Sequence, residues 1–118
     1  MRTILAAVLA MTASVAVADE LNDALKLAVS GRDTYWNCIA QEYGRDGNKN
    51  LSEQEFIARV ASACPSERQS FRVALVEYLT MQSPNADSGE HMTTANQAIA
   101  VAEKDIVTAF VRRKAESK

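Results

Sequence analysis

Most of the side-chain chemistry that enzymes use is scarce in this sequence. It contains one histidine, His91, no cysteine pair in CxxC spacing and no glycine-rich loop that could hold a phosphate. A Ser/His/Asp or Cys/His catalytic set would therefore have to include His91. That residue lies beside a polar segment, where we expect a solvated side chain just before a helix. We predict a protein that is not an enzyme and uses no cofactor.

A surplus of positive charge is also lacking. The 13 lysines and arginines are outnumbered by 15 aspartates and glutamates, which gives a formal net charge of −2 at pH 7. Nucleic acids and anionic membranes attract proteins through clustered cations. The cluster Arg112-Arg113-Lys114 is explained by its position, because cations are favoured at a helix C-terminus. We expect no nucleic-acid partner.

No apolar run is long enough for a confident membrane span, but the N-terminal segment has the pattern of a signal peptide. Arg2 supplies a short positive region, residues 4–11 are apolar, and residues 15–18 form the small–x–small sequence that signal peptidases read. We predict a signal peptide over residues 1–18 and a single helical domain over residues 19–118. The domain is expected to be periplasmic or secreted, without stable membrane insertion.

Proline and glycine, the residues that interrupt helices, are rare, with two and four copies. Apolar residues recur at helical spacing, which predicts an all-α fold, a small bundle of about four helices. The predicted helices cover residues 20–43, residues 52–64, residues 66–81, and the segment from Thr93 or Thr94 to residue 115. The polar segment 82–90 carries many loop-forming residues and is predicted to be a loop.

Two boundary features refine this prediction. In the first helix we expect a bend or a break around Gly31, and we expect one inward stripe formed by Leu21, Leu25, Ala28, Trp36, Ile39 and Tyr43. In the third helix, residues 66–69 read Ser-Glu-Arg-Gln, which predicts a capping box at its start.

The two cysteines, Cys38 and Cys64, favour a disulfide, because an even count in a small exported domain is typical of one. Closing a loop of about 27 residues would stabilise the fold by roughly 3–3.5 kcal/mol. A straight antiparallel hairpin would leave the cysteines out of register, so either the first helix ends before Tyr43 or the second helix crosses it at an angle, and we expect the crossing. Free thiols or a half-built metal site are the alternatives.

The segment RDGNKNLSEQEF, residues 45–56, resembles a shortened EF-hand calcium loop. Asp46, Asn48 and Asn50 match the first three ligand positions, and Glu55 matches the final acidic ligand. Two residues of the full loop are missing, including the glycine that makes its sharp turn. The resemblance implies a weak calcium site built from these four residues.

The same residues are also explained without an ion. Asp46 and Gly47 form a dipeptide typical of turns. Residues 52–55 read Ser-Glu-Gln-Glu, a capping box for the helix that follows, and Leu51 is placed to pack on Phe56 one turn later.

Two functional classes follow. The first is a non-catalytic protein-interaction module, such as a stress chaperone, a regulator, or an inhibitor or immunity protein, which binds an unknown protein in the exported compartment. Its expected contact residues are Tyr35, Trp36 and Tyr43. The alternative is a weak calcium-binding protein. A homodimer is compatible with either class.

Overall fold

The fold is entirely helical in the part of the chain that the structure describes. The computed structural model describes the backbone of residues 2–117 and the side chains of residues 17–117. It contains four α-helices and a short 3-10 helix: α1 (Arg2–Gly44), η1 (Asp46–Asn48), α2 (Glu53–Ser62), α3 (Pro65–Gln82) and α4 (Ser88–Glu116). No strand occurs within residues 2–117, so the predicted all-α class with four helices is confirmed.

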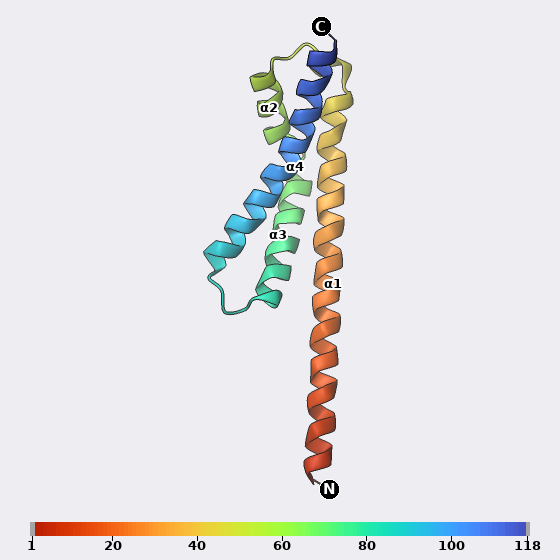
Figure 1. Ribbon diagram of the computed structural model, residues 1–118, viewed down its shortest axis with the longest axis vertical. Coiled ribbons are helices and arrows are strands. Elements are labelled where there is room, and N and C mark those ends of the chain that lie inside the picture. The colour runs from red at the N-terminus through yellow and green to blue at the C-terminus, as the bar shows by residue number, and fades with distance from the viewer. Residues whose placement is uncertain (1, 118) are drawn as a thin grey trace.

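Helix α1 is the longest element, and the other helices pack along it (Figure 1). The other helices gather along its C-terminal part, whereas its N-terminal part projects beyond them, and the chain measures 78 × 24 × 23 Å. The signal peptide was predicted over residues 1–18. Of these, Met1 and the side chains of residues 2–16 lie outside the described residues, so the signal peptide stays a prediction. Among the described helices, none combines the length and the apolar character needed to cross a membrane.

One hydrophobic cluster joins all four helices. Its closest aromatic pair is Phe56 of α2 and Phe110 of α4, whose rings stack with centroids 3.9 Å apart and nearly parallel planes. Tyr35 of α1 and Phe71 of α3 form a second, wider pair at 6.3 Å. The buried cluster consists of Tyr35, Ile39, Phe56, Val60, Phe71, Ile99, Ala102, Ile106 and Phe110. Burial of these side chains is the main source of stability.

The break expected near Gly31 is wrong, because α1 runs through this position without interruption. A Cβ atom at Gly31 would lie 3.1 Å from the Cα atom of Phe71. That distance is tighter than ordinary packing, so the missing side chain allows the backbones of α1 and α3 to approach closely. Gly31 is therefore a helix-packing position and not a helix breaker.

The predicted inward stripe of α1 is confirmed at Ala28 and Ile39 and wrong at Leu25 and Trp36. The residues that α1 buries are Ala24, Ala28, Tyr35, Ile39 and Glu42. Leu25 and Trp36, both assigned to the interior, remain 40% exposed. With about 100° between successive residues, the observed face, which adds Ala24, Tyr35 and Glu42, is rotated from the predicted one by roughly 50–60°.

Three helix boundaries also differ from the predictions. Helix α2 ends at Ser62 and not at residue 64, because Pro65 disfavours the right-handed helical conformation at Cys64. Helix α3 begins at Pro65, and its first turn has no side-chain cap, so the capping box predicted at residues 66–69 is absent. Helix α4 begins at Ser88, several residues earlier than expected, because the side chain of Asp87 accepts a hydrogen bond from the N–H of Gly89.

Arg113 connects the C-terminal ends of α1 and α4. Arg113, in the last turn of α4, donates a hydrogen bond from its guanidinium to the Tyr43 carbonyl oxygen at 2.8 Å. The same guanidinium lies 4.1 Å from the centre of the Tyr43 ring. Arg113 thus satisfies a carbonyl at the end of α1 that has no partner within that helix. Arg113 itself lies in the last turn of α4, where the sequence predicted cations.

Candidate interaction surface

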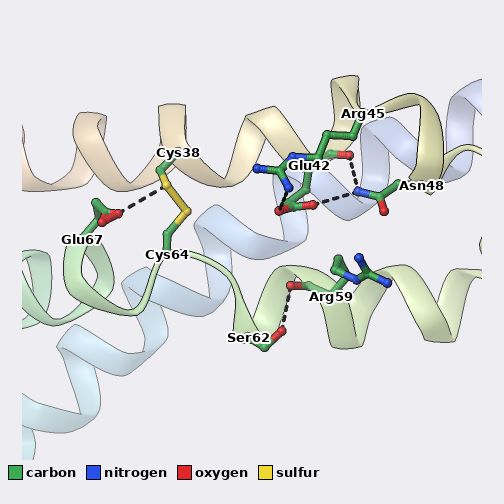
Figure 2. A network of polar contacts seen from close by, with 8 residues as sticks. All are labelled: Cys38, Glu42, Arg45, Asn48, Arg59, Ser62, Cys64 and Glu67. Carbon is green, nitrogen blue, oxygen red and sulfur yellow. Dashed lines mark hydrogen bonds and ion pairs between the residues drawn. A yellow bond between two sulfur atoms is a disulfide. The ribbon is translucent and has the colours of Figure 1, made fainter.

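The predicted disulfide is present between Cys38 and Cys64. The two sulfur atoms lie 2.00 Å apart and the two Cα atoms 6.3 Å apart, so the bridge connects α1 to the residue that precedes α3 (Figure 2). The expected register problem is resolved by the early end of α2, which leaves Ala63 and Cys64 outside any helix. Cys64 adopts a left-handed backbone conformation with φ of 55°. This conformation redirects the chain from α2 into α3.

Three of the four residues of the calcium-loop prediction, Asp46, Asn48 and Glu55, have local partners. Asp46 is exposed and its carboxylate lies 2.9 Å from the ammonium of Lys49, which lowers the pKa of Asp46. Asn48 is buried and points inward, where its amide donates to the carbonyl oxygen of Glu42 at 2.9 Å and to the Glu42 carboxylate at 2.8 Å (Figure 2). Asn50 is exposed. Asp46 and Asn48 therefore contact separate partners in this structure, and a calcium site stays a prediction.

The fourth calcium-loop residue, Glu55, belongs to a capping box. Its carboxylate accepts a hydrogen bond from the N–H of Ser52 at 3.0 Å, and its own N–H donates to the Ser52 hydroxyl at 3.1 Å. The first of these bonds lowers the pKa of Glu55. Leu51 packs against the cluster that contains Phe56. The predicted turn and capping box are thus confirmed.

The three rings predicted to contact a partner have different environments. Tyr35 is fully buried, so its assignment to the contact surface is wrong. Its hydroxyl donates to the Glu103 carboxylate at 3.0 Å, and burial, reinforced by the charge of Glu103, raises the pKa of Tyr35 to about 12. Tyr43 is half-buried beneath Arg113. Trp36 is 40% exposed and is the ring most available to another molecule.

Trp36 belongs to an exposed apolar stripe that α1 shares with α4. Leu25, Val29 and Trp36 follow one another at spacings of four and seven residues, which places them on one side of α1. Val101 of α4 lies beside Trp36 and is 60% exposed. We name Leu25, Val29, Arg32, Trp36 and Val101 the Trp36 surface.

Two hollows adjoin the Trp36 surface and share Arg32. One, of about 540 Å³, lies between α1 and α4 and is lined by Arg32, Asp33, Trp36, Asn37, Val101 and Asp105. The other, of about 240 Å³, extends from Leu25 and Val29 toward α3 and is lined mostly by apolar side chains, among them Phe71 and Leu75. The surface is therefore shaped and not flat.

The charges of this surface lie around its apolar residues. Arg32 and Asp33 form an exposed ion pair at 3.1 Å, and Asp105 lines the opposite side of the larger hollow. An aromatic and aliphatic centre with a polar rim is the usual arrangement of a protein-binding surface. The charged rim favours a particular partner orientation more than it adds affinity.

Sequence reasoning missed several residues that matter here. Val101, Arg32 and Val29 were not identified as surface residues, although the spacing of Leu25, Val29 and Trp36 was visible in the sequence. His91, expected to be solvated, is buried in the first turn of α4. Its Nε2 atom lies 3.2 Å from the Ser83 carbonyl oxygen. Because a carbonyl can only accept, Nε2 donates this bond and secures the loop between α3 and α4.

The comparisons with known proteins give no relative for this arrangement. No protein-family description matches the chain. No curated protein and no solved structure shows significant similarity to it.

Proposed function

We propose that the protein is an exported, non-catalytic protein-interaction module that binds its partner through the Trp36 surface. The observation that carries this proposal is the exposure of Trp36 beside Val101, at the edge of a hollow with a polar rim. Tryptophan and arginine are the residue types most enriched among those that dominate binding energy. Both occur in this surface, as Trp36 and Arg32.

The energetics of Trp36 support this role. An exposed aromatic ring next to exposed aliphatic side chains leaves apolar area in contact with water, and a partner that covers it gains about 25 cal/mol per Å². The Trp36 side chain already makes contacts within the fold, so it is held on one side before binding. A ring that is fixed in this way loses less conformational entropy when a partner covers it.

The absence of catalytic activity is supported by the use that the fold makes of its histidine. His91 is buried and donates to a backbone carbonyl, so it serves the packing of α4. Export is supported by the N-terminal sequence pattern and by the disulfide between Cys38 and Cys64, since such bonds persist in oxidising compartments. Within this class, a stress chaperone, a regulator and an inhibitor or immunity protein remain the three candidate roles.

The test is site-specific photocrosslinking in living cells. A photoreactive amino acid replaces Trp36, and in a matched control it replaces Ile57 of α2, which is 38% exposed and distant from the Trp36 surface in sequence. We expect protein adducts from position 36 that are absent from position 57. One dominant adduct would indicate a regulator or an inhibitor, whereas many different adducts would indicate a chaperone. Equal adducts at both positions, or none at position 36, would refute the proposal.

A second variant separates binding from folding. Trp36→Ala should reduce the yield of adducts from a photoreactive group placed at Val101, because the two side chains line the same hollow. Its thermal midpoint should change by only a few degrees, since the ring is not part of the buried cluster. An unchanged adduct yield in a folded Trp36→Ala protein would contradict a central role for this ring.

A further inference from the structure

A carboxylate touches the disulfide. The Oε2 atom of Glu67 lies 3.3 Å from the Sγ atom of Cys38 (Figure 2). A sulfur in a disulfide carries no proton, so this contact is not a hydrogen bond while the bridge is closed. The two sulfurs and a Glu67 oxygen all lie within 4.8 Å of one another. Helix α1, through Cys38, and the start of α3, through Cys64 and Glu67, therefore bring two sulfur ligands and one oxygen ligand to a single point.

The distances suit a tetrahedral divalent cation once the S–S bond is open. With Zn–S distances of about 2.3 Å and a Zn–O distance of about 2.0 Å, tetrahedral geometry requires about 3.8 Å between sulfurs and about 3.5 Å between sulfur and oxygen. The observed S···O distance of 3.3 Å is already close to that value. The Cα atoms of Cys38 and Cys64 are 6.3 Å apart, near the upper end of the range for disulfides. Side-chain rotation can therefore separate the sulfurs with little backbone movement.

Contacts other than the bridge also position these three residues. Arg68 donates from one guanidinium nitrogen to the carbonyl oxygens of Ala61 at 2.8 Å and Ala63 at 2.9 Å, which anchors the segment leading to Cys64. Glu67 lies in the first turn of α3, directly before Arg68. Cys38 lies in α1 next to Ile39, a fully buried member of the core. The site is thus preorganised by helix packing.

The three residues are also accessible. Cys38, Cys64 and Glu67 are all partly exposed. Glu67 lines one end of the groove of about 910 Å³ between α1 and α3, together with Pro65 and Ser66. A hydrated cation can therefore reach the site and retain a water molecule as a fourth ligand.

We infer that the reduced protein binds a divalent cation of borderline softness, with Zn²⁺ as the type, through Cys38, Cys64 and Glu67. A small dithiol supplies two electrons and two protons, becomes a cyclic disulfide, and leaves two protein thiols. The cation then binds both sulfurs as thiolates and releases the two protons to solvent. Disulfide and metal complex exclude each other, so the thiol redox state decides whether the site exists. This inference is independent of the proposed function.

The test uses Co²⁺ and Zn²⁺ with the full chain. The protein is reduced with dithiothreitol, separated from it without oxygen, and titrated with Co²⁺. We expect one equivalent to bind with the charge-transfer absorption of thiolate–cobalt bonds, to be displaced by Zn²⁺, and to be absent from the oxidised protein. Glu67→Gln should weaken binding by about tenfold or more, because it replaces an anionic ligand by a neutral amide. Glu77→Gln, at another point of the same groove, is the control and should bind like the wild type.

Two further measurements show whether the reduced chain stays folded while it binds the cation. Zn²⁺ should slow the air oxidation of the two thiols in the wild type, and much less so in Glu67→Gln. Circular dichroism should show the same helix content in the reduced protein with and without Zn²⁺. Equal cobalt affinity in wild type and Glu67→Gln would overturn the inference, as would the absence of thiolate–cobalt absorption. A reduced chain that stays unfolded in Zn²⁺ would also overturn it.

Discussion

Two glycines of α1 provide a sharp test of the packing between α1 and α3. Both Gly31 and Gly44 lie within the helix, and alanine is favoured over glycine inside a helix by about 0.5–1 kcal/mol. At Gly44, a new Cβ atom meets nothing within 4 Å. At Gly31, it would lie 3.1 Å from the Cα atom of Phe71, and a backbone atom cannot move aside as a flexible side chain can. The two substitutions should therefore have opposite signs.

The magnitudes follow from these two terms. Gly44→Ala should stabilise the protein by roughly 0.5 kcal/mol, at the lower end of the propensity range because the residue ends the helix. Gly31→Ala gains the propensity term but forces α1 and α3 apart, and overpacking of a closely packed interior costs about 1–3 kcal/mol. We expect a net loss of about 1 kcal/mol, or a midpoint lowered by about 4–8 °C.

Thermal unfolding followed by circular dichroism measures both variants against the wild type. Equal helix content before unfolding would show that the difference arises from packing and not from loss of α1. The reasoning would be refuted if Gly31→Ala melted at or above the wild-type temperature. That result would mean that α1 bends or ends near residue 31 in solution, as the sequence alone had suggested.

Three further predictions concern single interactions. Tyr35→Phe removes the hydrogen bond to Glu103 of α4 and should lower the free energy of unfolding at neutral pH by about 1 kcal/mol, measured by urea unfolding. Because folding raises the pKa of Tyr35 above its ordinary value near 10 to about 12, the stabilisation is fully present below pH 10 and is lost as the pH rises toward 12. Wild type should therefore lose stability more steeply than Tyr35→Phe in that range, and parallel curves would contradict this assignment. Replacing Cys38 and Cys64 together by serine should lower the free energy of unfolding by about 3.5 kcal/mol, because the bridge restricts the unfolded chain over a sequence separation of 26. A loss below about 1 kcal/mol in denaturant unfolding would contradict this chain-entropy argument. Ser52→Ala removes the N-cap of α2 and should lower the free energy of unfolding by about 1 kcal/mol. Ser62→Ala, at the other end of α2, is the control, and equal losses in the two variants would contradict a stabilising role of the cap.

Features that depend on neighbouring residues in the sequence could be predicted. The four helices follow from apolar spacing, the capping box at residues 52–55 follows from a four-residue pattern, and the disulfide follows from there being two cysteines. Each is fixed by interactions within a few residues or by a count. For the same reason, the calcium interpretation of residues 46–55 could be weighed against a turn and a cap before the structure showed the capping bonds.

Features that depend on contacts distant in sequence could not be predicted. The residues around Gly31 do not indicate that it faces Phe71, 40 positions away. Because glycine often interrupts helices, a bend was predicted there. Local sequence also does not reveal that His91 is buried and donates to the Ser83 carbonyl oxygen, so it was predicted to be a solvated residue. In both cases a partner on another segment reversed the local preference, as tertiary contacts commonly do.

The rotation of α1 shows how such an error can identify a surface. Apolar residues occupy more of the circumference of α1 than its neighbours can cover, so periodicity alone cannot say which of them are buried. Helices α3 and α4 cover Tyr35 and Ala28, and they leave Leu25 and Trp36, at the edge of the predicted stripe, in contact with water. Single exposed apolar residues are common and need no explanation, but a row of them beside an exposed residue of a second helix does. The Trp36 surface is therefore one place where the sequence carries apolar character that this fold alone does not bury, and a partner that covers it would account for that part of the excess.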